Sequence, residues 1–338
     1  IAEPGEFSKR AFLNDKLDLA QAEAIADLID SGTSQAARAA LRSLRGDFSR
    51  AVNALVSQLT DLRVHVEAAI DFPEDEIDFL SDEKLLQRLR DCAAAFVKLR
   101  STAAVGRVLR DGYQVVLVGK PNAGKSSLMN RLSGEDTAIV TEIAGTTRDI
   151  LRENIDIAGL AVELVDTAGL RDNPDVIERE GMRRAREAMA SADAVLWIQD
   201  ATDSNSGDTH EPVPDGVPVI VVRNKSDLVD EDQPGEGAVV LSAKTGEGLD
   251  ELRESIRRLA GYSNLGEGAL TARRRHVDAL QRAAAYFDAG NKALSQNGAG
   301  EILAEELRLA QQALGEITGA VSSDDLLGRI FADFCIGK

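Results

Sequence analysis

Residues 119–126 read Gly-Lys-Pro-Asn-Ala-Gly-Lys-Ser, and this stretch decides the fold of the central part of the chain. It matches the pattern G-x-x-x-x-G-K-[ST], with an apolar run at 115–118 before it and a helical pattern after it. In that setting the backbone N–H groups of the loop converge on phosphate oxygens at a helix N-terminus. Lys125 adds a positive charge for the β- and γ-phosphates, and the Ser126 hydroxyl is placed to ligate Mg²⁺. The sequence therefore predicts a phosphate-binding loop. Its other predicted nucleotide contacts are Asn122, Ala123, Gly124 and Ser127.

Short β-rich runs continue on the C-terminal side of this loop, with helical segments between them. The runs are 162–165, 194–198, 217–222 and 238–241. This alternation is the pattern of a parallel sheet covered by helices. We therefore expect one α/β domain over residues 112–262.

The two flanks of that domain are helical in character. One apolar stripe recurs at steps of three and four from Ala37 to Ala69, which predicts a single helix of about ten turns after a cap at Thr33 or Ser34. A second helix follows, with Leu85, Leu86, Leu89, Ala93, Phe96 and Val97 expected on one side. Because the apolar faces in 1–111 and 263–338 need partners, the simplest interpretation is one all-α domain in two halves, with residues 112–262 inserted.

Composition limits the classes of function. The formal net charge is −18, and it divides into −4, −12 and −2 over 1–111, 112–262 and 263–338. Such a balance argues against a protein that grips nucleic acid or an anionic membrane through its own basic residues. Two cysteines make no disulfide framework, and no apolar run reaches the length of a membrane span, so we expect a cytoplasmic protein.

Two further motifs complete the expected magnesium site. The run at 162–165 ends in Asp166-Thr167-Ala168-Gly169, where Asp166 can hold the Mg²⁺ shell directly or through water. Gly169 can offer its N–H to the γ-phosphate and so sense hydrolysis. Between the two motifs, Thr147 of the segment 145–149 is the hydroxyl that we expect to complete the shell.

Base selection is expected from residues that follow the last two strands. Asp227, in Asn224-Lys225-Ser226-Asp227, can accept from the N1–H and the 2-amino group of guanine. Adenine has neither donor, so it would leave that carboxylate unpaired. Ser242-Ala243-Lys244 can bring a backbone N–H to the guanine O6. With all of these motifs in order, the sequence predicts a guanine nucleotide-binding domain that hydrolyses GTP.

The hydrolytic water needs a positioning group that the motifs do not supply. Leu170 stands where many small GTPases have a glutamine, and leucine cannot orient water. Glu178 is the candidate, and from the residues alone a solvated glutamate at a helix start is an equally good interpretation. Added positive charge is also needed. The carbonyl of Asn122 could help to hold a monovalent cation against the phosphates.

The helical segments carry a resemblance to a known family. They contain Pro4-Gly5-Glu6-Phe7, the stretch from Asp18 to Ile25, Asp71-Phe72-Pro73, Glu305-Glu306-Leu307-Arg308 and the C-terminal Phe334-Cys335-Ile336-Gly337-Lys338. With the nucleotide motifs, these resemble the MnmE (TrmE) family of tRNA-modification GTPases over essentially every residue. The match is specific because these segments have no role in generic GTP binding.

The resemblance implies a helical domain in two halves with an inserted GTPase domain. It also implies an N-terminal domain that binds a tetrahydrofolate derivative and dimerises, which we expect to be absent here because the chain begins at Ile1. The family works with an FAD-containing partner, MnmG (GidA). Together they install a carboxymethylaminomethyl or aminomethyl group at C5 of the wobble uridine of certain tRNAs. We expect that partner to supply most of the grip on tRNA, and we expect no membrane contact.

The resemblance also assigns roles to single residues. It implies K⁺ at Asn122, Thr141, Ile143 and Thr146, with Thr141 contacting the nucleotide as well. GTP hydrolysis would then be stimulated by K⁺ when two GTPase domains meet. Glu178 becomes the residue that orients water. Cys335 matches a family cysteine associated with the modification reaction, and a purely structural thiol is the alternative for it.

A different class of function competes with this one. A regulatory switch of the ribosome-assembly type would hold GTP for long periods and would have no direct role in modification chemistry.

Overall fold

A computed structural model describes residues 2–71, 83–135, 151–166, 186–203, 213–229, 237–262, 269–320 and residue 330. The chain divides into two compact units, one of residues 1–110 with 267–338 and one of residues 111–266. We call the first the helical unit and the second the sheet unit. Among the described residues, no helix combines the length and the apolarity that crossing a membrane requires.

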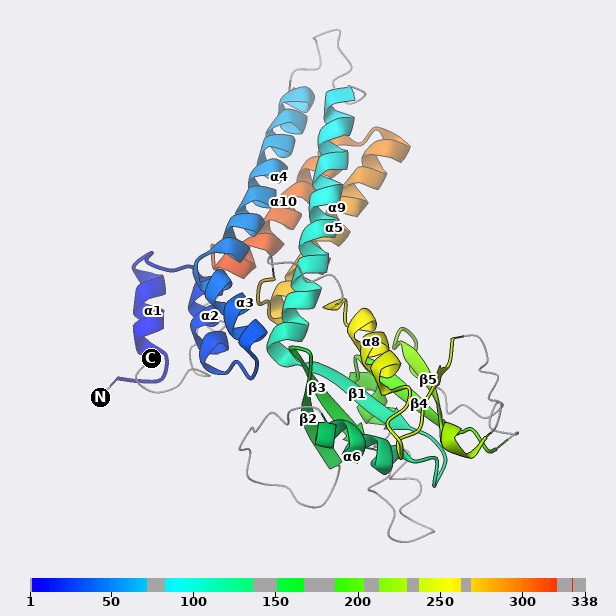
Figure 1. Cartoon of the computed structure of the whole chain (residues 1–338). Helices are drawn as coiled ribbons and strands as arrows, with labels where there is room; N and C mark the ends of the chain where they lie inside the picture. The colour runs from blue at the N-terminus through cyan, green and yellow to red at the C-terminus, as the bar shows by residue number, and fades with distance from the viewer. Residues whose placement is uncertain are drawn as a thin grey trace. The chain divides into compact units, whose positions relative to one another are not determined.

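The helical unit is built around four long helices that run side by side (Figure 1). The helices whose bounds the described residues give are α1 Glu6–Leu13, α2 Leu19–Ile29, α3 Ser34–Leu44, α4 Asp47–Asp71, α5 Glu83–Asp111, α9 Arg274–Asn297 and α10 Gly300–Thr318. Leucine and alanine dominate the core between α4, α5, α9 and α10, where the rings of Phe96 and Phe287 lie 5.3 Å apart. Burying these side chains is the main stabilising term for helices that have one apolar face.

The prediction of one helix from residue 34 to 71 is wrong, because the chain breaks between α3 and α4. Gly46 has φ 85°, a left-handed conformation that ends a helix and that few other residues adopt. The apolar spacing continues through the break, but α3 buries a different set of side chains from the predicted stripe. Helix α3 buries Ala36, Ala39, Ala40 and Ser43 and leaves Leu41 exposed. The predicted stripe is confirmed in α4, from Phe48 to Val66.

Two further predictions concern the cap of α3 and the buried face of α5. Thr33 caps α3, since its side chain accepts from the backbone N–H of Ala36 at 3.1 Å, as predicted. In α5, Leu85, Leu89 and Phe96 are buried as expected. Leu86 and Val97 are exposed instead, because they lie on a different side of the helix from the buried stripe.

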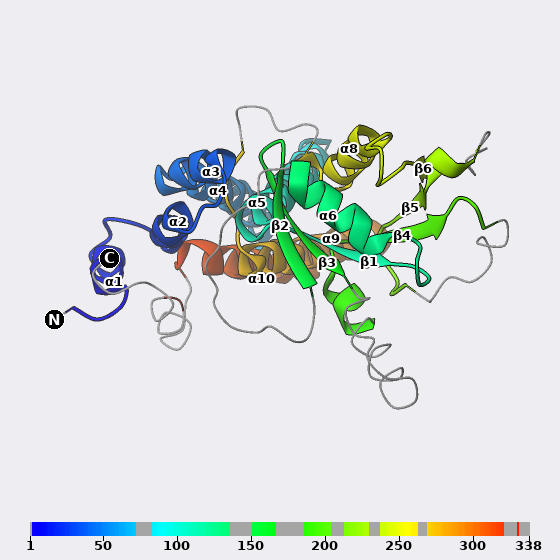
Figure 2. The same cartoon turned by 60° about the horizontal axis from the view of Figure 1, so that its bottom comes forward.

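The described residues of the sheet unit form six strands in the order β2-β3-β1-β4-β5-β6, which can be followed across Figure 2. They are β1 Tyr113–Val118, β2 Leu151–Ile157, β3 Leu160–Asp166, β4 Ala194–Asp200, β5 Val219–Asn224 and β6 Val239–Val240. Helices of this unit include α6 Lys125–Glu135, the single turn η2 Ser226–Leu228 and α8 Leu249–Leu259, and residues 186–191 are helical as well. Strands β1, β3, β4, β5 and β6 pair in parallel and confirm the predicted runs.

The expectation of an all-parallel sheet needs correction, because β2 pairs antiparallel with β3. Sequence inspection missed β2, which is mostly polar, alternates only over residues 154–157 and makes no continuous apolar run. Ala158 and Gly159 join the two strands, both with positive φ, which is the geometry of a tight two-residue hairpin. The fold is therefore a mixed α/β sheet, with an antiparallel edge strand on a parallel core.

Candidate nucleotide site

The predicted phosphate loop connects a central strand to a helix. Strand β1 lies between β3 and β4, and Val115, Val116 and Leu117 are completely buried. The chain leaves the carboxyl end of β1 at Gly119 and enters α6 at Lys125. The backbone N–H groups at the start of α6 are therefore presented beside the loop, where they and the helix dipole favour an anion.

Lys125 is held over its own loop. Its Nζ donates to the carbonyl of Gly119 at 2.7 Å and to that of Lys120 at 3.0 Å, and the residue is only 6% exposed. Both contacts are hydrogen bonds from the ammonium group to carbonyl oxygens. The result is a buried cation at the centre of the loop.

Ser126 and Asp166 bring two oxygen ligands together from different elements. The Oγ of Ser126 donates to Oδ2 of Asp166 at 2.9 Å, and the Asp166 side chain ends β3 in a fully buried position. Register places Asp166 opposite Leu117 of β1, so the two carboxyl ends meet at one edge of the sheet. Hydroxyl and carboxylate oxygens are the donors that Mg²⁺ takes, and this pair fits a magnesium ion that keeps several of its waters.

Asn224 joins the phosphate loop to the loop after β6. Its Nδ2 donates to the carbonyl of Ala123 at 2.9 Å, and its Oδ1 accepts from the backbone N–H of Ala243 at 2.9 Å. The side chain is 2% exposed, so all of these polar groups are satisfied inside the protein. This residue holds two loops together rather than facing outward.

Asp227 and Ser242 form a second short pair at the same edge. The Ser242 hydroxyl donates to Oδ1 of Asp227 at 2.6 Å and accepts from the N–H of Thr245 at 3.2 Å. The Nζ of Lys244 lies 4.0 Å from the other carboxylate oxygen of Asp227, Oδ2, and the Lys244 side chain is mostly exposed. Ser242 thus fixes the rotamer of Asp227 and leaves Oδ2 on the side away from the serine.

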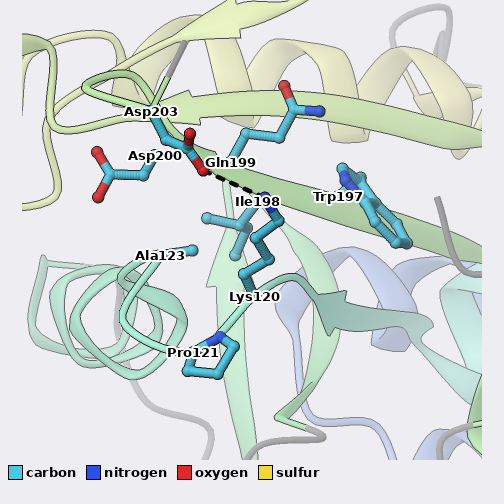
Figure 3. Close-up of a pocket in the computed structure, with 8 residues that line it drawn as sticks. All are labelled: Lys120, Pro121, Ala123, Trp197, Ile198, Gln199, Asp200 and Asp203. Atoms are coloured by element: carbon cyan, nitrogen blue, oxygen red, sulfur yellow. Dashed lines mark hydrogen bonds and ion pairs between the residues drawn. The ribbon is translucent and has the colours of Figure 1, made fainter. Parts of the chain in front are cut away.

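Two acidic residues that the sequence interpretation missed lie beside these motifs. Asp200 ends β4 and pairs with Lys225 at 2.6 Å, while Asp203 pairs with Lys120 of the phosphate loop at 3.1 Å. Figure 3 shows Lys120 pointing toward Asp203 and paired with it. Both residues line a small cavity of about 100 Å³, and Trp197 lines it as well. The available signal was position: Asp200, like Asp166, follows an apolar strand directly.

The electrostatics of Asp200 follow from these partners. Burial raises the pKa of its carboxyl, but hydrogen bonds from Lys225 and from the hydroxyl and N–H of Thr202 outweigh burial and lower the pKa. Asp200 is therefore ionised near neutral pH and keeps Lys225, which has a left-handed φ of 71°, in one position.

The remaining predicted site residues fall into two groups. Asn122 and Ser127 are exposed, and Asn122 has a left-handed φ of 63° that asparagine tolerates. The others lie outside the described residues, and they are Thr141, Ile143, Thr146, Thr147, Thr167, Ala168, Gly169, Glu178 and Cys335. In the part of the chain that the structure describes, no group of three or more His, Cys, Asp or Glu side chains could hold a metal.

The fold and these loops define a P-loop GTPase domain inserted into an all-α domain whose two halves lie on either side of it in the sequence. A family model described as the MnmE helical domain matches residues 19–335. The tRNA modification GTPase MnmE of Ectopseudomonas mendocina (strain ymp) is 54% identical, over 100% of this chain and 77% of that protein. The protein of the same name from Erwinia tasmaniensis gives the same identity and the same coverage. The chain belongs to the MnmE family of tRNA modification GTPases.

Solved structures give a weaker likeness. A point variant of Aquifex aeolicus Era bound to GDP·AlF4⁻ is 26% identical, with a TM-score of 0.34 over 54% of this chain and 67% of that one. The G domain of the T. maritima iron transporter FeoB is 24% identical, with a TM-score of 0.32 over 44% of this chain and 98% of that one.

Proposed function

We propose that this chain is a potassium-activated GTP hydrolase that acts with an MnmG (GidA) partner on tRNA. Together they would install a carboxymethylaminomethyl or aminomethyl group at C5 of the wobble uridine. Membership of the MnmE family supports the tRNA substrate. The observation that carries the GTPase part is the meeting of Lys125, the Ser126–Asp166 pair and the Ser242–Asp227 pair at one edge of the sheet.

Each of these groups has a chemical task in the proposed site. Lys125 exchanges its carbonyl partners for the β- and γ-phosphate oxygens, so a buried cation meets the charge that grows during hydrolysis. Ser126 and Asp166 would hold Mg²⁺, with Thr147 as a third ligand. A metal held there would supply positive charge that neutralises the phosphate oxygens. Thr167, Ala168 and Gly169 would contact the nucleotide, and the Gly169 N–H would sense whether the γ-phosphate is present.

Asp227 would select the base. Its Oδ2 is free of the serine bond, and a guanine can donate to the carboxylate from two positions. Adenine offers no donor at those two positions. A bound adenine would therefore exclude water from the Asp227 carboxylate without giving it a hydrogen bond in return. Asn224, Lys225, Ala243 and Lys244 would shape the loops around the base.

Water activation and the monovalent cation complete the proposal. Glu178 would orient the attacking water, because Leu170 cannot. Asn122, Thr141, Ile143 and Thr146 would hold K⁺ beside the phosphates, in the place where other GTPases use an arginine. Cys335 would act near the one-carbon chemistry.

Membership of the MnmE family supports a set of proposed partners. A tetrahydrofolate derivative would bind an N-terminal domain through which the protein dimerises, and FAD would bind the MnmG partner. Because the net charge of residues 112–262 is −12, that partner would provide most contacts to tRNA. The cytoplasm is the expected location.

Steady-state GTP turnover in KCl and in NaCl at equal ionic strength tests the proposal. We expect faster turnover in K⁺, and we expect Asn122→Ala to lose this difference while GTP still binds. Asn130→Ala, an exposed asparagine on α6, is the matched control. Equal and slow turnover in both salts would instead favour the regulatory switch.

A further inference from the structure

Helix α2 carries two buried carboxylates that the nucleotide site does not use. Glu23 is 1% exposed and Asp27 is 7% exposed. They are four residues apart, so both side chains lie on one face of the helix. The first of them belongs to the stretch from Asp18 to Ile25, which sets this family apart and has no role in GTP binding.

Glu23 ties α2 to two other helices. Its two oxygens accept from Nε and Nη2 of Arg275 at 2.7 and 2.5 Å, and Oε2 also lies 2.9 Å from Nε2 of His276. Arg275 further donates to the carbonyls of Glu316 and Ile317 at 2.8 and 3.1 Å. These carbonyls belong to the last turn of α10, where a helix has no partners of its own for them. Glu23 therefore fixes the first turn of α9 and the end of α10 together.

Asp27 holds the two segments through which the sheet unit is attached. A single oxygen, Oδ1, accepts from Nε of Arg110 at 2.9 Å and from Nη2 of Arg273 at 2.7 Å. Arg110 is the last residue of the helical unit before the sheet unit begins at 111. Arg273 follows the return of the chain to the helical unit at 267 by only a few residues. One carboxylate thus joins the entering and the leaving segment.

The composition of this cluster makes its geometry specific. It contains two carboxylates and three guanidinium groups, all partly or fully buried. Desolvation offsets much of the attraction in such clusters, so their net contribution to stability is small. Removing one partner leaves a buried charge without compensation, which disfavours any arrangement other than the observed one. Apolar packing would hold the helices as well, but it would not specify the position of the attachment segments to the same degree.

We propose that Glu23 and Asp27 are positioning residues that couple the nucleotide state of the sheet unit to the end of α10. The inference rests on the proposed GTP-binding function. The sheet unit has two covalent attachments, and a change of conformation that moves either of them acts on Asp27 through Arg110 or Arg273. Arg273 and Arg275 both belong to the start of α9, so the same movement reaches Glu23 and the carbonyls of α10. The residues beyond α10, Cys335 among them, follow this point in the chain.

Amide hydrogen exchange on the full chain tests the coupling. Exchange in the last turn of α10 is compared without nucleotide and with GDP, aluminium fluoride, Mg²⁺ and K⁺. We expect the nucleotide to change that rate by about fivefold or more, the lower end of typical coupling between sites. Asp27→Asn is expected to abolish the change while GDP affinity stays within about twofold. The readout is the nucleotide-dependent difference, which a merely structural role would not move.

Two further variants supply a second test of the coupling and a control. Arg110→Gln removes the link between Asp27 and the entering segment and leaves the link between Asp27 and Arg273 in place. It therefore tests the coupling even if Asp27→Asn folds poorly. Glu305→Gln is the control, because Glu305 pairs with Arg308 in an exposed position on the same helix α10. It is expected to transmit the full change.

Two outcomes would overturn the coupling. One is a wild-type chain that binds GDP with no change of exchange in α10, and the other is a pair of variants that transmit the change as the wild type does. A wild-type chain that binds no guanine nucleotide would overturn the proposed function, and the coupling with it.

Discussion

Gly124 approaches Asn224 so closely that no side chain fits between them. A Cβ placed on Gly124 would overlap Nδ2 of Asn224, and Gly124 has a φ of 95°. The contact exists because Asn224 donates to the carbonyl of the neighbouring Ala123. The glycine of the loop motif is therefore required by the distant asparagine as well as by any bound phosphate.

Gly124→Ala is expected to weaken GDP binding by about tenfold or more. The new methyl must displace Asn224, and alanine at this φ costs about 1–2 kcal/mol by itself. Isothermal titration with GDP measures the loss. The control is Gly134→Ala in α6, where a Cβ meets nothing within 4 Å. That control should bind GDP normally. Wild-type affinity in Gly124→Ala would show that the two loops can separate without loss.

Asp227→Asn is expected to exchange GTP for xanthosine triphosphate as the preferred nucleotide. The new amide can donate to the 2-oxo group of xanthine, while the guanine amino group loses its acceptor. Competition between the two nucleotides for one fluorescent analogue gives the ratio of affinities. Asp250→Asn, at a fully exposed position on α8, serves as the matched substitution. A retained preference for GTP would remove Asp227 from base selection.

The sequence predicted those elements whose signal is local. Strands β1 and β4 are apolar runs that are buried on both faces, and β3 and β5 are apolar runs with one less buried face. Thr33 caps a helix next to its own sequence position. The break at Gly46 was missed because apolar spacing continues on both sides of it. Strand β2 was missed because an edge strand with one wet face shows only a short alternating pattern.

The residues of the candidate site also divide into those with a local sequence signal and those without one. Lys125, Ser126 and Asp166 belong to short sequence motifs, so the sequence pattern alone predicted them. Asp203 pairs with Lys120 across 83 positions, and Asp27 pairs with Arg273 across 246. No local pattern carries such pairs, since only the fold brings them together.

Gly106→Ala is expected to destabilise the helical unit by about 1–3 kcal/mol, the usual cost of overpacking. A Cβ on Gly106 would lie 2.5 Å from the carbonyl oxygen of Leu270 and 2.9 Å from the nitrogen of Ala272. Both are backbone atoms that cannot rotate away, so the gain of about 1 kcal/mol in helix propensity is outweighed.

Urea denaturation followed by circular dichroism measures this change. Ser101→Ala on the exposed side of the same helix should stay within about 0.5 kcal/mol of the wild type. A Gly106→Ala chain more stable than the wild type would show that the segment around Leu270 can move aside at little cost.

His276 is expected to make the helical unit less stable as the pH falls below about 6.5. Burial lowers the pKa of His276 most, Glu23 opposes this, and Arg275 and Arg273 lower the pKa further. The ring is neutral in the folded state, since its Nδ1 accepts from the backbone N–H of Arg273 at 3.1 Å. The unfolded chain takes up a proton below about pH 6.5 and the folded chain does not, so stability falls in that direction.

The slope expected for one such proton is at most about 1.4 kcal/mol per pH unit. Burial raises the pKa of Glu23, but His276 and Arg275 hold it well below its usual range, so the contribution of Glu23 is lost only in stronger acid, below about pH 4.3. Between pH 7.5 and 5.5, His276→Gln should therefore show a smaller fall in the urea midpoint than the wild type. His65→Gln on α4 is the histidine control and should keep the wild-type fall. Circular dichroism is the right probe, because the single tryptophan, Trp197, reports on the sheet unit. An unchanged fall in His276→Gln would place the acid sensitivity elsewhere in the chain.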